Sequence, residues 1–262
     1  MRNMSNYKDW IDAVDIKIDY FSAFMKAWIA FNSWYESGEI PGKTDKDHIE
    51  HIAEHTNRFK TYVMNLINVD NSEGISYRDS IANLHESLLS AAITTQEYIG
   101  VRQTVSFAEI ASKNANVHSK IDYYFNSYEC TRSKGKITTC VSVKQSGKKV
   151  FEFEQDEYKK DELQAQSDFM TLSITQKEKC LSCYEDLRPY ICESVLDTSE
   201  DAKKIGQYGF VNDADKISKA IVIILYMLRC CLAHGDISPD ESANKVYKYA
   251  YEVLTTPLKK LR

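Results

Sequence analysis

Glycine and proline are scarce in this chain, whose 262 residues include nine glycines and four prolines. Long segments rich in Leu, Ile, Lys, Glu and Ala therefore run without helix breakers, which argues against a β-sandwich or barrel. Hydrophobic residues make up 43% of the sequence, enough to build a sizeable core in one elaborated domain or two small ones. The composition predicts a mainly α-helical protein.

A secretory signal and a long apolar run are also missing. The first ten residues, Met1 to Trp10, are polar and mixed in charge, without the basic start and apolar core of a signal peptide. The longest apolar stretch, Ala220 to Leu228, is far shorter than the roughly 20 residues that a membrane-spanning helix needs. We therefore expect a cytoplasmic protein with no membrane partner.

Neither a disulfide framework nor a basic excess is indicated. The seven cysteines are an odd number, and Cys230 and Cys231 are adjacent, which fits reduced thiols better than disulfide pairs. The net charge of −5 argues against a surface covered in basic residues for nucleic acid. Any contact with RNA must therefore be local.

One segment, residues 132–149, contains six basic residues and no acidic one. Its lysines Lys144, Lys148 and Lys149 are candidate contacts for an RNA backbone. The alternative is that exposed lysines protect the edges of a small two-stranded sheet from pairing with other chains. The sequence leaves both interpretations open.

Apolar residues recur every three or four positions near both ends of the chain, which is typical of amphipathic helices. Helices are predicted over residues 10–36, 48–68 and 76–98. A fourth begins at Asn212 or Asp213 and closes at His234 and Gly235, because glycine favours the C-terminal turn. A fifth spans Glu241 to Leu254, after Ser238 as N-cap and a proline at the first helical position.

The middle of the chain has a different character. Residues 137–143 are rich in β-branched side chains and are followed by a turn and a second apolar run, which predicts a β-hairpin over about 137–154. Further helices are predicted from about Asp156, one of them with a capping box at Thr175 to Glu178 and a course towards Leu196. We expect one domain with core helices at about 10–98 and 212–262 and an insertion at 100–200.

The end of the fourth helix carries the most informative pair of residues, Arg229 and His234. Arginine presents a permanently charged planar fork that matches a phosphate, and histidine exchanges a proton near neutral pH. Five positions on a straight helix place two side chains about 140° apart. Convergence of the pair therefore requires a distorted C-terminal turn or a second copy of the chain.

Arg229-Cys-Cys-Leu-Ala-His234, with Gly235 and the closing helix, resembles the Arg-x4-His signature of the HEPN superfamily. The first predicted helix adds to the resemblance, because residues 27–35 are similar to the aromatic first helix of several bacterial HEPN families. The resemblance covers the first helix and the last two. It implies a HEPN-like helical bundle, here with an inserted β-hairpin.

The resemblance also implies a function. Many HEPN proteins are dimeric, metal-independent ribonucleases in which two such motifs meet at the dimer interface. By this resemblance Arg229 would bind the scissile phosphate and His234 would transfer a proton as the ribose 2′-hydroxyl attacks, with no cofactor. The expected partners are RNA, a second copy of the chain and an antitoxin or other regulatory protein, in a toxin or antiviral defence role.

Two other interpretations stay open. Active members usually carry Asn, Asp or His directly after the arginine, whereas this chain has Cys230. A catalytically inactive HEPN module that binds RNA, a nucleotide or a partner protein is therefore one alternative. The other is a structural helical bundle with a chance motif.

Three further motifs contain candidate site residues. Asn32, inside an aromatic cluster, is a candidate to face the same cleft as Arg229, or to make a hydrogen bond within the core. The histidines His48, His51 and His55 share one side of a predicted helix, but the first and last are roughly 10 Å apart, too far for one zinc ion, so a solvated face is favoured. Cys180 and Cys183 have the spacing of half a zinc site without a second half, which favours helix packing.

Overall fold

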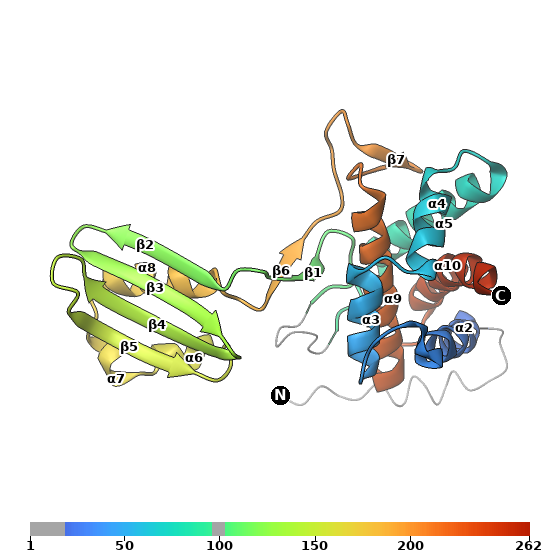
Figure 1. The fold of residues 1–262 in the computed structure, drawn as a ribbon. Helices are drawn as coiled ribbons and strands as arrows, with labels where there is room; N and C mark the ends of the chain where they lie inside the picture. Colours follow the sequence, from blue (N-terminus) through green and yellow to red (C-terminus); the bar gives the residue numbers. More distant parts are fainter. Residues whose placement is uncertain (1–18, 96–102) are drawn as a thin grey trace. The chain divides into compact units, whose positions relative to one another are not determined.

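The computed structural model describes residues 19–95 and 103–262, and the chain divides into two compact units. Unit 1 combines Met1–Ala111 with Cys192–Arg262, and unit 2 is Ser112–Ile191. Figure 1 shows helices in both units and a four-stranded sheet in unit 2. The prediction of a mainly α-helical bundle is wrong, because the fold is mixed α and β with several antiparallel sheets.

Helices form most of unit 1. They are α2 (Tyr20–Trp34), the π-helical turn η1 (Tyr35–Glu39), α3 (Asp45–Glu54), α4 (Arg58–Asn68), α5 (Ser72–Ala91), α9 (Ala214–His234), α10 (Glu241–Leu258) and the 3-10 turn η2 (Lys259–Leu261). The helix α9 packs against α3 and α4, and α10 packs against α2 and α5. Every residue from Ala220 to Leu228 is buried, so α9 is apolar on all sides and is the core helix of the unit.

Short strands complete unit 1. The strands β7 (Lys203–Ile205) and β8 (Tyr208–Phe210) form an antiparallel hairpin. Gly206 at its turn has a φ of 57°, a left-handed conformation that glycine adopts without strain. The strands β1 (Ile110–Lys113) and β6 (Tyr190–Glu193), on which the chain enters and leaves unit 2, pair with each other.

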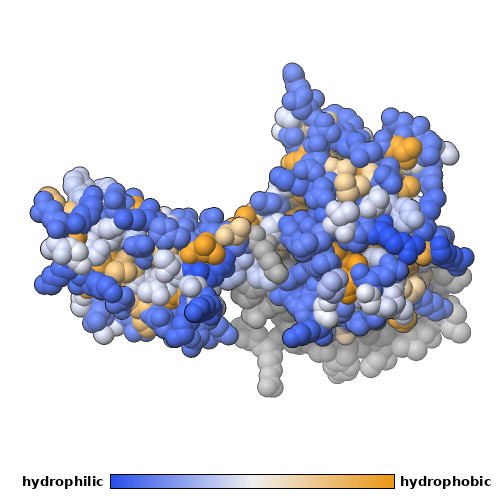
Figure 2. All heavy atoms as spheres, in the orientation of Figure 1, coloured by the Kyte–Doolittle hydropathy of each residue, from blue (hydrophilic) through white to orange (hydrophobic). Residues whose placement is uncertain are grey.

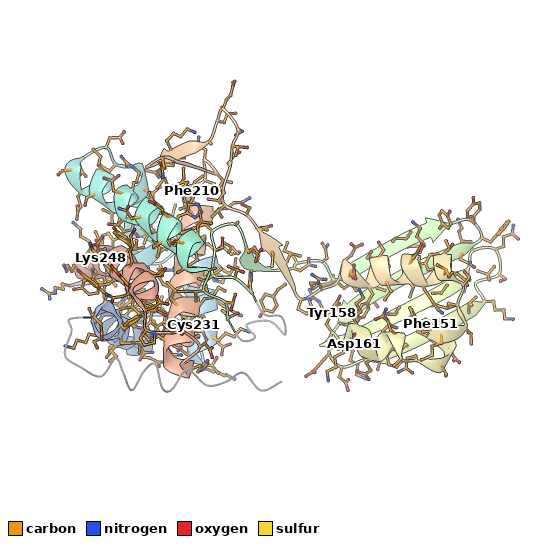
Figure 3. The ribbon with its side chains drawn as sticks, turned by 180° about the vertical axis from the view of Figure 1, so that it is seen from behind. Phe151, Tyr158, Asp161, Phe210, Cys231 and Lys248 are labelled. Carbon is orange, nitrogen blue, oxygen red and sulfur yellow. The ribbon has the colours of Figure 1, made fainter. Side chains whose placement is uncertain are left out.

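Unit 2 is an antiparallel sheet covered on one face by helices. Its strands are β2 (His118–Tyr123), β3 (Asn126–Ser133), β4 (Lys136–Val143) and β5 (Lys149–Gln155), in that order across the sheet. Its helices are α6 (Lys160–Gln164), α7 (Ser167–Thr171) and α8 (Ile174–Glu185). Figure 3 shows these helices over the sheet, where Phe151 of β5 meets Phe169 of α7 with 5.6 Å between ring centroids. A second hydrophobic core therefore lies inside unit 2.

Several predicted elements match the structure and others do not. The hairpin over 137–154 is confirmed as β4 and β5, but β2 and β3 were not predicted because their sequences are largely polar. The helix predicted over 48–68 is two helices, since the backbone is extended at His55 and Asn57. The helix expected to reach Leu196 ends at Glu185 and is followed by a strand. Parts of the first and third predicted helices lie outside the described residues.

Within the described part of the chain, one helix is long and apolar enough to cross a membrane by length and composition. It is α9, and 67% of its most apolar window is buried inside the structure. That burial is typical of a core helix.

Candidate functional site

The helix α9 places the motif residues where the helix leaves the core. Asp213 caps its N-terminus through bonds from the backbone N–H groups of Asp215 and Lys216, as its sequence predicts. At the other end Gly235 adopts a left-handed φ of 68°, and its N–H and that of Asp236 bond back to α9 carbonyls. The helix therefore ends at His234, the position that the sequence indicates.

Exposure along α9 changes abruptly at Arg229. The preceding residues are buried, whereas the Arg229 side chain is 30% exposed and His234 is exposed. The hydroxyl of Tyr247 on α10 donates to the carbonyl of Leu228 at 2.7 Å, which holds the backbone directly before Arg229. Both motif side chains thus reach solvent from a rigidly held helix end.

An acidic residue, Asp45, lies against Arg229. The Nη1 atom of Arg229 is 3.5 Å from Oδ2 of Asp45, at the start of α3. The Nε atom of Arg229 is buried without a hydrogen-bond partner. Burial by itself would lower the pKa of Arg229, but the Asp45 carboxylate together with Cys230 and Tyr226 outweighs burial, so the pKa of Arg229 is raised. Arg229 is therefore a fixed cation at this site.

Hydrogen bonds extend this pair to Asn32 on α2. The Nδ2 group of Asn32 donates to the Tyr35 hydroxyl at 2.6 Å, and that hydroxyl donates to Oδ1 of Asp45. Asn32 also approaches the same carboxylate oxygen at 3.5 Å. Burial and the neighbouring carboxylate raise the pKa of Tyr35 well above its usual range, so its hydroxyl remains a donor.

The structure thus brings Asn32 and Arg229 together through Asp45 and Tyr35. We call these four residues the arginine cluster. The sequence contains a weak signal for Asp45, because Thr44 caps α3 and acidic residues are common in a first helical turn. That signal locates the helix start but does not indicate that it faces Arg229. Tyr35 was predicted only as part of an apolar stripe.

Cys230 lies beside the cluster and is half-buried. Burial raises the pKa of its thiol above the usual range, although Arg229 and Tyr226 lie within hydrogen-bonding reach. The side chain is therefore a neutral thiol, which can hydrogen bond only weakly to a bound phosphate.

The candidate lysines belong to unit 2. Lys144 and Lys148 lie in the turn between β4 and β5, and Lys149 is the first residue of β5. All three are exposed, and Lys149 forms an ion pair with Glu152 of the same strand. Lys144 and Lys148 pair with no carboxylate among the described residues. Two other basic residues of segment 132–149 are already engaged, since Lys136 pairs with Glu154 and Arg132 donates to backbone carbonyls.

The histidines of α3 do not converge on one point. His48 is buried and stacks on Tyr35, with its Nδ1 3.0 Å from the carbonyl oxygen of Ile40. His51 and His55 instead stack on each other, with 4.2 Å between ring centroids. Across residues 19–95 and 103–262 there is no group of three His, Cys, Asp or Glu side chains placed to hold a metal ion.

The cysteines Cys180 and Cys183 face the core of unit 2. Burial raises the pKa of Cys180 to about 12, so its thiol is protonated and unreactive at neutral pH. Cys183 donates to the carbonyl of Ser119 at 3.0 Å. Both residues pack α8 against the sheet.

Comparison of the chain with models of known protein families, with curated proteins and with solved structures found no match. The resemblance to the HEPN superfamily therefore depends on the sequence alone.

Proposed function

We propose that unit 1 is a metal-independent endoribonuclease of HEPN type, which acts as a homodimer in the cytoplasm without a cofactor. One observation carries the proposal: Arg229 and His234 are the motif residues, and α9 becomes accessible at these residues after an entirely buried stretch. Basic side chains also stabilise a helix C-terminus through the helix dipole, so the proposal rests on the match of both residues to the motif and on their access to solvent. A toxin or defence role with an antitoxin partner follows from the resemblance alone.

In the proposed reaction Arg229 binds the scissile phosphate and stabilises the charge that develops on its oxygens. The ribose 2′-hydroxyl attacks the phosphorus atom, and the bond to the 5′-oxygen of the next nucleotide breaks. His234 assists the transfer of the proton from the 2′-hydroxyl, and the leaving 5′-oxygen takes up a proton, so the reaction consumes and releases no net proton. The products are a 2′,3′-cyclic phosphate and a free 5′-hydroxyl end.

The geometry of α9 favours a composite site in a dimer. The helix remains α-helical through His234, so no distortion turns the two side chains towards each other. They consequently leave the helix about 140° apart. A two-fold axis beside this helix end would bring Arg229 of one copy towards His234 of the other.

The test is cleavage of a labelled RNA pool in the presence of EDTA, with analysis of the product ends. We expect cyclic-phosphate ends with the wild-type protein and their loss in Arg229→Ala and His234→Ala. Arg58→Ala and His118→Ala, at other exposed sites, are matched controls that should cleave normally. Cleavage that persists in both motif variants would remove these residues from the mechanism.

A mixing experiment tests the composite site. A heterodimer of Arg229→Ala and His234→Ala subunits contains one site with both motif residues intact. An equal mixture should recover about a quarter of the wild-type activity, because half of the dimers are mixed and each has one intact site. A mixture that stays inactive while its subunits exchange would contradict a site built from two copies.

A catalytically inactive module that binds RNA, a nucleotide or a partner protein is the second candidate. The ion pair between Arg229 and Asp45 favours it, because the carboxylate competes with a phosphate for the guanidinium. RNA binding by a wild-type dimer that leaves the RNA intact would support this candidate.

A further inference from the structure

Three consecutive aromatic residues are exposed at the turn between β2 and β3. Tyr123 is the last residue of β2, and Tyr124 and Phe125 form the two-residue turn. Tyr124 is 75% exposed and Phe125 is 72% exposed. On the face that Figure 2 shows, hydrophilic side chains predominate in this unit, with scattered apolar ones among them. Neighbouring aromatic rings that leave much of their surface in solvent are candidates for contact with another molecule.

The backbone of this turn adds a second observation. Tyr124 has a φ of 48°, in the left-handed region where glycine and asparagine are favoured. At the opposite end of the sheet, the turn between β3 and β4 places Lys134 at a φ of 51° and Gly135 at a φ of 84°. The β2–β3 turn holds an exposed aromatic ring in a conformation that a small residue would adopt more easily.

Lysines surround the three rings. The β4–β5 turn lies at the same end of the sheet, because Asn126 pairs with Val143 and the N–H of Lys144 donates to the carbonyl of Phe125 at 2.8 Å. That turn carries Lys144 and Lys148, both exposed. From α8, the Nζ atom of Lys179 lies 5.0 Å from the ring centroid of Tyr123. One carboxylate, that of Asp122, lies near Lys144.

We propose that this aromatic and basic end of the sheet binds single-stranded RNA. Bases would stack on Tyr124 and Phe125, and the phosphates between them would contact Lys144 and Lys148. Lysine is depleted at protein interfaces, which argues against a protein partner. The choice of RNA rests on the proposed function. This RNA site includes aromatic residues as well as the lysines that the sequence indicated.

The experiment measures binding of a short fluorescein-labelled single-stranded RNA to the full chain, with His234→Ala as the background so that the RNA is not cut. Tyr124→Asn combined with Phe125→Ser should weaken binding about tenfold or more, through loss of stacking. Asparagine accepts the left-handed backbone, so this variant should retain the thermal stability of the parent. Ile174→Ser, which changes a residue 77% exposed in the same unit, should bind as the parent does.

The lysines are tested by charge removal and salt. Lys144→Gln with Lys148→Gln should weaken binding and reduce its salt dependence, whereas Lys134→Gln, in the β3–β4 turn, should have little effect. Unchanged RNA affinity in a folded aromatic variant would overturn the proposal. Binding to vesicles of phosphatidylcholine and phosphatidylserine is measured with the same variants. If the variants lose vesicle binding but keep their RNA affinity, the proposal is overturned and the surface binds a membrane instead. If the wild-type protein binds RNA through this turn but does not cleave it, only the proposed function is refuted.

Discussion

Asp45 is the carboxylate that contacts the guanidinium of Arg229. It accepts a hydrogen bond from the buried Tyr35 hydroxyl and lies 3.5 Å from the Arg229 guanidinium. The arginine and aspartate side chains are both partly exposed, so solvent weakens their attraction. A phosphate with two oxygens offers the guanidinium a better geometry than this single long contact.

The Asp45→Asn variant keeps an acceptor oxygen for Tyr35 but removes the competing charge. We expect its KM for RNA to fall about two- to fivefold, the effect of losing one partly exposed ion pair, with little change in kcat. Steady-state cleavage of a defined RNA measures both constants. Asp79→Asn, an exposed residue of the same unit, controls for the change in net charge. A rise in KM would mean that Asp45 positions Arg229 instead of competing for it.

Between elements, a buried lysine joins three helices of unit 1. Lys60 on α4 is buried, and its Nζ atom lies 2.8 Å from both the carbonyl oxygen of Ala53 and Oδ1 of Asp215. Asp215 is in the first turn of α9, so this ion pair holds the start of the helix that ends in the motif. A buried ammonium needs its counter-charge.

Removal of the two partners should have unequal effects. Asp215→Ala leaves a buried charge and should lower the free energy of unfolding by about 2 kcal/mol or more. Lys60→Met removes the buried charge itself and should be less destabilising than Asp215→Ala. The double variant Lys60→Met/Asp215→Ala should be more stable than Asp215→Ala alone. Urea unfolding of the three variants measures this order. Equal losses in both single variants would show that packing, and not charge, governs the contact.

The contact of α5 with the β7–β8 hairpin contains a buried histidine. His85 packs edge-on against Tyr208, with 4.5 Å between centroids, and its Nδ1 has no hydrogen-bond partner. Burial lowers the pKa of His85 below its ordinary value, so the folded state holds the neutral ring.

This lowered pKa predicts a dependence of stability on pH. Below about pH 6.5 the unfolded chain binds a proton at His85 that the folded chain does not. The free energy of unfolding should therefore fall as pH decreases from 7 to 5, by up to about 1.4 kcal/mol per unit from this residue. His85→Leu should remove that part of the slope. An identical slope in the variant would assign the effect to other groups, such as His51, whose pKa burial also lowers.

At the scale of the whole molecule, the two units have separate cores and different architectures. The pairing of β1 with β6 holds together the two chain segments that connect them. A short linker can therefore replace unit 2 without stretching the chain of unit 1. Each unit has the elements that it needs to bury its own apolar surface.

Replacement of residues 112–191 by a short Gly-Ser linker should leave unit 1 folded, with a cooperative thermal transition by circular dichroism. Under the proposals above, this shortened chain should retain cleavage but bind single-stranded RNA more weakly, because the aromatic turn is gone. Residues 112–191 expressed alone should unfold in a transition of their own. If neither the shortened chain nor residues 112–191 alone folds, the two units do not fold independently.

The sequence by itself determined both ends of α9 and the position of Arg229 and His234 at a helix terminus, whereas α10 runs to Leu258, four residues beyond the predicted Leu254. Asp213 and Gly235 act through local backbone geometry, and the apolar period of a helix is also local, so no tertiary information is needed. The start of α10 at Glu241 is likewise as predicted, although Asp240 and not Ser238 is its cap. The hairpin of β4 and β5 has the same local origin.

Only the tertiary structure decided the rest. The polar strands β2 and β3 are held by pairing with β4, so whole-chain composition concealed the sheet and favoured a helical fold. Asp45 meets Arg229 because α3 packs on α9, a contact between segments far apart in the sequence. Phe125 meets Lys144 because strand register aligns two turns at one end of the sheet. Long-range packing and register set these neighbours, and neither is encoded in a local pattern.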